Sequence, residues 1–182
     1  MGQTVRLRPR PRSQPGTADE PEGQVTQHDR DAVLAAVIAE ADRRLDGSLP
    51  WDPAVAERCF GTQDRLVSIL QVRWHTHLAW LVEEALDAEP MDLAKAVIDA
   101  WRTCALDLPG VRRILDVHAD SPGMQVAHRK DWELLASAKG LAAADDPRVD
   151  ATGRRIEELA RSGAQLGPAT ATTDEHQTPG AS

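Results

Sequence analysis

The chain has 182 residues, of which 41% are apolar, enough for one domain with a real core and flanking segments. Its formal net charge of -8 disfavours nucleic acid or an anionic membrane as the partner of the main body. The two cysteines, Cys59 and Cys104, are too few for a disulfide framework, and no apolar run is long enough to span a bilayer or to act as a secretory signal. We therefore expect a cytoplasmic protein with reduced, buried thiols.

The two ends of the chain have the composition of disordered segments. Residues 1–25 are rich in Pro, Arg, Gly and Glu, and residues 163–182 in Ala, Thr, Gly and Pro, so neither can offset the entropy of ordering. Four arginines form a basic arm in the first segment: Arg6, Arg8, Arg10 and Arg12. An extended, proline-stiffened arm can contact nucleic acid by following a phosphate backbone or a minor groove. It is also typical of a solvated tail, because acidic residues follow it closely.

Between the tails, residues 26–162 predict a single all-α domain without any strand signal. Capping residues, Asp-Pro and Ser-Pro pairs and glycines divide this region into six or seven helices. We place them at about residues 29–46, 52–61, 62–87, 92–108, 111–118, 121–140 and 146–162. Short connections predict that sequential helices pack antiparallel or at steep angles around the long central helix. The last helix has only a weak apolar face, so we expect it to be peripheral.

The central helix, at 62–87, is apolar on almost every face. Three stripes at helical spacing run along it: Leu70, Trp74, His77 and Leu81; Val67, Leu78 and Val82; Leu66, Ile69 and Trp80. A surface helix keeps its opposite side polar, so this one must be surrounded by helices of its own chain or by a partner chain. We expect a homodimer that forms through the central helix or through the sixth helix, at about 121–140. Because tryptophan is enriched in contact surfaces, we predict Leu66, Ile69 and Trp80 as its contact residues.

A second hypothesis is a ligand sensor. Trp74 and Trp101, with His77 as a polar tip, would line a pocket for a small apolar ligand. The segment Cys59-Phe60-Gly61-Thr62-Gln63-Asp64-Arg65-Leu66, followed by a long helix, resembles the junction between the DNA-binding and ligand-binding parts of TetR-type repressors. The resemblance implies a helical ligand-binding core, with the basic arm assisting DNA contact. The chain between Val33 and Phe60 is shorter than the three-helix DNA-binding unit of that family.

Catalytic and metal-binding motifs are scarce. His75 and His77 stand two residues apart and diverge by roughly 200° around a helix, so they share a metal ion only with help from another helix, such as the one that carries His118. No Glu-x-x-His pair, nucleophile elbow or glycine-rich phosphate loop accompanies them. A metal-dependent helical enzyme is thus the third hypothesis, and we predict no cofactor. The leading hypothesis is a non-enzymatic regulatory or interaction module that acts through protein–protein contact.

Overall fold

The computed structural model describes residues 25–138 and 147–163, and within these ranges it contains seven α-helices and no strand. The helices are α1 (Gln27–Arg44), α2 (Pro53–Phe60), α3 (Gln63–Asp87), α4 (Leu93–Asp107), α5 (Pro109–Val117), α6 (Pro122–Ser137) and α7 (Val149–Ser162). The predicted all-α class is confirmed. The two segments predicted as tails, apart from their innermost residues, lie outside the described ranges, and so do Arg6, Arg8, Arg10 and Arg12. None of the helices described is both long and apolar enough to cross a membrane.

Side-chain caps begin most of the helices where the sequence predicts. Thr26 and Asp29 form a reciprocal capping box at the start of α1: the Asp29 N–H donates to Thr26 Oγ1 at 3.1 Å, and the Thr26 N–H to Asp29 Oδ2 at 2.9 Å. Four further side chains accept a hydrogen bond from a first-turn N–H: Asp52, Thr62, Asp92 and Ser121. These caps satisfy donors that a helix cannot satisfy itself, and so they fix where each element starts.

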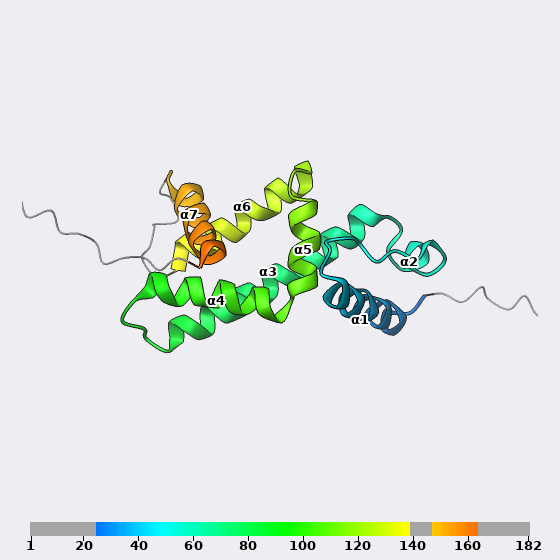
Figure 1. Cartoon of the computed structure of the whole chain (residues 1–182), viewed down its shortest axis with the longest axis horizontal. Helices are drawn as coiled ribbons and strands as arrows, with labels where there is room; N and C mark the ends of the chain where they lie inside the picture. The colour runs from blue at the N-terminus through cyan, green and yellow to red at the C-terminus, as the bar shows by residue number, and fades with distance from the viewer. Residues whose placement is uncertain (1–24, 139–146, 164–182) are drawn as a thin grey trace, which may run out of the picture.

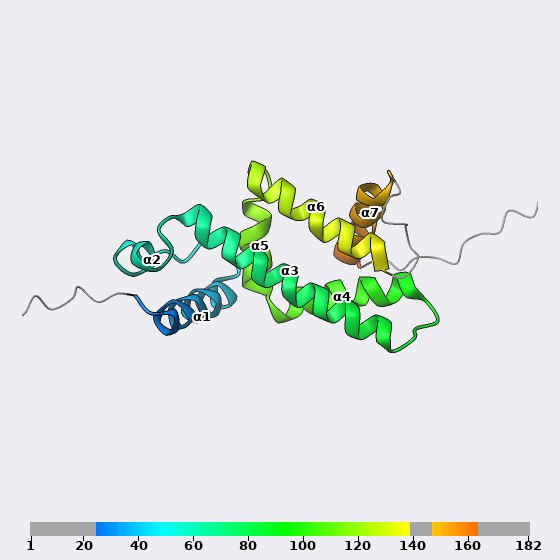
Figure 2. The ribbon, with the colours of Figure 1, turned by 180° about the vertical axis from the view of Figure 1, so that it is seen from behind.

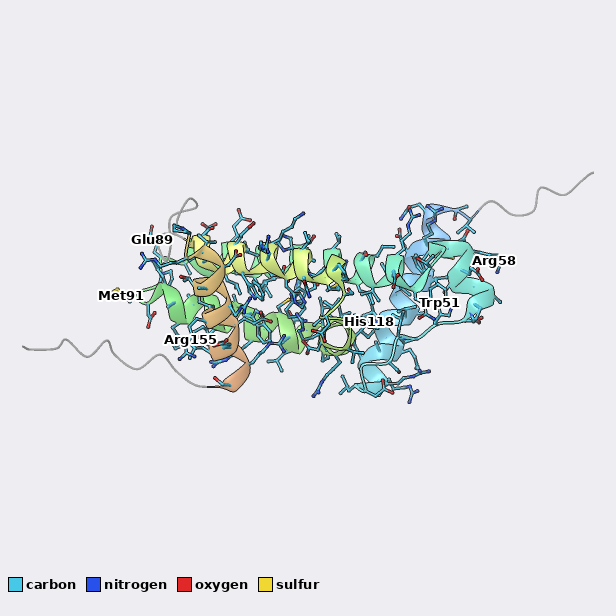
Figure 3. The ribbon with its side chains drawn as sticks, turned by 90° about the horizontal axis from the view of Figure 1, so that it is seen from above. Trp51, Arg58, Glu89, Met91, His118 and Arg155 are labelled. Atoms are coloured by element: carbon cyan, nitrogen blue, oxygen red, sulfur yellow. The ribbon has the colours of Figure 1, made fainter. Side chains whose placement is uncertain are left out.

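The molecule is elongated, with α3 and α4 side by side along its length (Figures 1 and 2). A turn at 88–92 joins α3 and α4, so the two helices run antiparallel. α6 runs back from α5 towards the end of the molecule where this turn lies, and α7 packs across α6 and against α4 there. α1 and α2 form the opposite end, with α1 against α5. Trp51 and Arg58 mark this end in Figure 3, and Glu89 and Met91 mark the turn. α3 contacts α2, α4, α5 and α6, which makes it the central helix.

The core forms on one side of α3. Eight residues of this side are buried: Leu66, Val67, Leu70, Gln71, Trp74, Leu78, Val82 and Leu86. The apolar ones form a single cluster with buried residues of the neighbouring helices, among them Val97 of α4 and Leu115 of α5. Burying each large apolar side chain stabilises the fold by about 1.5–3 kcal/mol. The opposite side is exposed, with Val72 at 65% and Trp80 at 54% exposure, so residues 25–138 and 147–163 cover only one side of this helix.

α7 packs more closely than its weak apolar pattern predicts. Its buried residues are Val149, Gly153, Ile156, Leu159 and Ala160, and it lies against α6 and α4. The prediction of a peripheral helix is wrong because two of these residues are small. Gly153 and Ala160 let α7 approach its neighbours closely, although they add almost nothing to an apolar stripe in the sequence.

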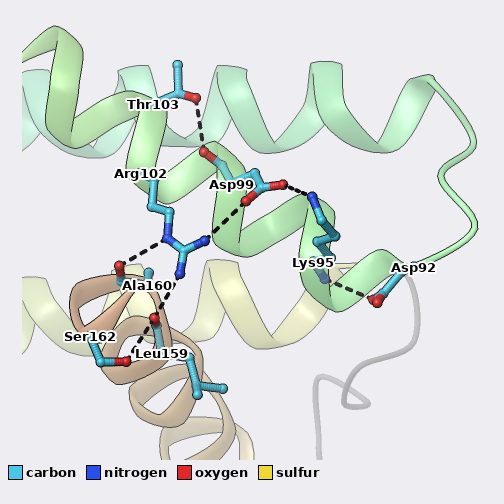
Figure 4. A network of polar contacts seen from close by, with 8 residues as sticks. All are labelled: Asp92, Lys95, Asp99, Arg102, Thr103, Leu159, Ala160 and Ser162. Carbon is cyan, nitrogen blue, oxygen red and sulfur yellow. Dashed lines mark hydrogen bonds and ion pairs between the residues drawn. The ribbon is translucent and has the colours of Figure 1, made fainter. Parts of the chain in front are cut away.

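A polar contact also ties α7 to α4, as Figure 4 shows. Arg102 of α4 donates from Nε to Ala160 O and from Nη2 to Leu159 O, each at 3.2 Å. These carbonyls belong to the last turn of α7, where the helix has no N–H of its own to offer. Asp99 Oδ1 accepts from Arg102 Nη1 at 3.4 Å, which steadies the guanidinium between the two helices.

Gly153 gives a direct test of the α6–α7 contact. A Cβ at this position would lie 2.1 Å from Trp132 O and 2.5 Å from Trp132 Cα, backbone atoms that move only if α6 shifts. We expect Gly153→Ala to lower the free energy of unfolding, measured in urea, by about 2–3 kcal/mol. Gly123→Ala is the control, because nothing lies within 4 Å of its Cβ. Equal stability of the Gly153→Ala variant and the wild type would contradict the packing described.

Candidate functional site

The three predicted interface residues do not share one environment. Leu66 is fully buried, because the first turns of α3 join the core cluster that also contains Phe60 of α2. Ile69 is half-buried, and Trp80 is 54% exposed. The inclusion of Leu66 in an exposed contact face is therefore wrong, whereas Ile69 and Trp80 lie on the outer side of α3.

A longer row of residues, here named the α3 stripe, follows this outer side. Its members are spaced by three or four positions and so share one face: Arg65, Ile69, Val72, Thr76, Trp80 and Glu83. All of them except Ile69 are exposed. Neither Arg65 nor Glu83 forms an ion pair with another residue of the described ranges. The stripe is thus basic at its start, mainly apolar in the middle and acidic at its end.

The Trp80 ring is held in place by its neighbours. The His77 imidazole stacks on it, with ring centroids 5.8 Å apart and planes at 18°. His77 Nε2 in turn lies 2.8 Å from Asp107 Oδ2 at the end of α4, which fixes the imidazole. A side chain whose rotamer is restrained in advance loses less entropy when a partner binds. Trp80 is therefore an exposed aromatic ring that is already ordered for contact.

The residues predicted to line a ligand pocket pack on one another instead. Trp74 is fully buried, and its ring meets Trp101 of α4 edge-on with centroids 5.7 Å apart. The Arg112 guanidinium of α5 lies over the Trp74 ring, 4.7 Å from its centroid. His77 makes its contacts on the exposed side described above. The protein's own side chains therefore fill the space beside Trp74 that the sensor hypothesis gives to a ligand.

Arg112 begins a chain of charges that links α5, α6 and α7. It is 5% exposed, burial lowers its pKa, and its Nη2 lies 3.0 Å from Asp116 Oδ1. The same oxygen accepts from Arg161 Nη2 at 2.8 Å, and Arg161 Nε donates to Glu157 at 3.0 Å. Trp132 Nε1 also donates to Glu157, at 2.6 Å. Burial would raise the pKa of Asp116, but the hydrogen bond from Arg161 keeps it below its ordinary value.

His75 and His77 contact different carboxylates. His75 Nδ1 lies 2.6 Å from Asp131 Oδ1 of α6, and Gln71 Nε2 donates to the other oxygen of Asp131 at 2.9 Å. The hydrogen bond to Asp131 raises the pKa of His75. Among the residues that the structure describes, no group of three or more His, Cys, Asp or Glu side chains could hold a metal ion. His75, His77 and His118 are therefore not brought together as the enzyme hypothesis requires.

Cys104 lacks the properties of a nucleophile. It is fully buried, and burial raises the pKa of its thiol to about 12. Because the thiolate is the reactive form, this side chain is inert near neutral pH and acts as a packing residue of α4.

Sequence reasoning missed two parts of this surface. Val72 belongs with Ile69 and Trp80 at helical spacing, a signal that the sequence carries on its own. The pairing of His75 with Asp131 joins residues 56 positions apart and leaves no local pattern, because it depends on how α3 and α6 pack. That pair is visible only in the folded chain.

No protein-family model, curated protein or solved structure matches this chain. The resemblance of residues 59–66 to the junction of TetR-type repressors therefore gains no support from a family match.

The His75–Asp131 pair predicts a pH dependence of stability. The pKa of His75 is raised above its ordinary value of 6.5 in the folded chain, so the protonated imidazole stabilises the fold. This contribution is complete at low pH and is lost as the pH rises through the raised pKa. We expect the stability advantage of the wild type over His75→Gln, measured in urea, to shrink as the pH rises above about 6. An advantage that stays constant as the pH rises would contradict the pairing.

Proposed function

We propose that this protein is a non-enzymatic interaction module that forms a homodimer through the α3 stripe. The observation that carries the proposal is an exposed, already ordered tryptophan on a helix whose other side is buried in the core. Buried aromatic anchors supply much of the binding energy of protein interfaces, and Trp80 has the size and the setting of such an anchor. Val72 and Ile69 extend the apolar surface around it.

The order of charges along the stripe favours a second copy of the chain as the partner. Arg65 lies at the beginning of α3 and Glu83 near its end, with the apolar residues between them. When two α3 helices pair antiparallel about a two-fold axis, the basic end of each stripe meets the acidic end of the other. Each Trp80 then lies over the Ile69–Val72 part of the other copy. The surface is thus complementary to itself.

The position of Arg65 in the first turn of α3 is a second observation that favours a homodimer. A positive charge in the first turn of a helix opposes the helix dipole, an effect of about 0.3–1 kcal/mol near a surface. Within the described residues Arg65 has no carboxylate partner that offsets this cost. A carboxylate from a second copy accounts for an arginine at this place.

A charge-reversal cycle tests the proposal. Arg65→Glu and Glu83→Arg each bring like charges together across the two-fold axis, whereas the double variant restores opposite charges. We expect each single variant to weaken dimerisation about tenfold and the double variant to recover most of the loss, measured by sedimentation equilibrium of the full chain. Both substitutions agree with the helix dipole, so α3 itself stays stable.

Sedimentation equilibrium also tests the role of Trp80 as the anchor of the interface. Trp80→Ser should weaken the dimer at least about thirtyfold, because a central tryptophan contributes about 2 kcal/mol or more to an interface. Met91→Ser is the control, since Met91 is a fully exposed apolar residue at the α3–α4 turn, away from the stripe (Figure 3). A chain that is monomeric at all concentrations, or a dimer indifferent to Trp80→Ser, would refute the proposal.

A further inference from the structure

A groove of about 300 Å³ lies between α3 and α6 and shares only Val72 with the α3 stripe. Val72 and Val126, which are 65% and 59% exposed, contribute methyl groups from the two helices, and Met124 adds an apolar side chain between them. Polar side chains of His75 and Lys130 line the same groove. Apolar walls with a few polar groups are the usual composition of a small-molecule site.

The fold presents the His75 ring to this groove in one orientation. Asp131 is 5% exposed and holds Nδ1 of the imidazole, while Gln71 occupies its other oxygen. Nε2 lies on the opposite edge of the ring from Nδ1, and no residue of the described ranges forms a hydrogen bond with it. Holding one ring nitrogen with a buried carboxylate fixes the direction of the other nitrogen. When the imidazole is protonated both ring nitrogens are donors, so Nε2 of the protonated ring can donate to a ligand.

The charges beside the groove favour an anion. The hydrogen bond to Asp131 raises the pKa of His75, which favours the protonated ring with a hydrogen on each nitrogen. Lys130 lies close enough to oppose this rise, and it forms no ion pair within the described residues. The protonated His75 ring and Lys130 carry two positive charges, of which Asp131 neutralises one. A single negative charge on a ligand completes the balance.

We propose that the α3–α6 groove binds a small monocarboxylate with a short alkyl group. The carboxylate lies between His75 Nε2 and Lys130 Nζ, where charge-assisted hydrogen bonds from two donors hold it. The alkyl group covers Val72 and Val126 and removes their exposed apolar surface from water. The groove volume is at the small end of the range for ligand sites, which limits the ligand to a few carbon atoms beyond the carboxylate.

Isovalerate is the probe for this site. Titration of the isotopically labelled full chain, followed by NMR, should give saturable shifts of the Val126 methyl groups and of the His75 ring, with a Kd of about 1 mM or below. Isovaleramide, which has the same shape without the charge, should bind at least about tenfold more weakly. Acetate, which has the charge without the branched alkyl group, should also bind more weakly.

Two lysine variants complete the test. Lys130→Gln should weaken isovalerate binding about tenfold, and because Lys130 is exposed the fold should be unaffected. Lys95→Gln is the matched control, since Lys95 pairs with Asp99 on α4, and it should leave the affinity unchanged. The proposal is overturned by the absence of saturable shifts up to about 20 mM isovalerate, by equal binding of isovaleramide, or by equal affinity in Lys130→Gln.

Because Val72 belongs both to the groove and to the α3 stripe, the titration is repeated with Trp80→Ser, which leaves the groove residues unchanged and removes the anchor of the proposed dimer. Saturable shifts in that variant support the groove whatever the outcome for the α3 stripe, and their absence there overturns the groove alone.

Discussion

The structure depends on a buried positive charge, the Arg112 guanidinium. It lies over the Trp74 ring of α3 and is 5% exposed, so it has lost nearly all of its hydration. A charge in this position needs a counter-charge nearby, and Asp116 supplies it. Asp116 also binds Arg161 of α7, whose second carboxylate partner is Glu157. One buried cation thereby connects α3, on whose Trp74 ring it lies, with α5 and, through Asp116 and Arg161, with α7.

This arrangement divides α3 into an inner and an outer side with different roles. The inner side, centred on Trp74, is completed by Trp101, Arg112 and the apolar cluster, so it leaves no space for a ligand. The outer side contains Trp80, which His77 orders and which stays 54% exposed among the described residues. The described helices around α3 pack on one side of it only, and the proposed dimer contact uses the other side.

The helix order was predictable from local chemistry, because signals such as Asp52-Pro53 act within one turn of the chain. The depth at which individual residues are buried was not predictable in the same way. Leu66 and Trp80 lie on the same side of an ideal helix, yet one is buried and the other exposed, since α2 and its neighbours cover only the first turns of α3. Gly153 gives no apolar signal although it allows the closest contact of α7. The His75–Asp131 pair depends on the register of α3 against α6, which no local pattern encodes.

The most direct test of the account is the stability of Arg112→Ala beside that of Arg113→Ala, measured by urea unfolding of the full chain. The two arginines are adjacent on α5, but Arg112 is buried over Trp74 and Arg113 is exposed. Loss of the buried cation should lower the free energy of unfolding by about 3 kcal/mol or more and loosen α7, whereas the exposed substitution should change it by about 0.5 kcal/mol or less. Equal effects of the two substitutions would contradict the central place given to Arg112.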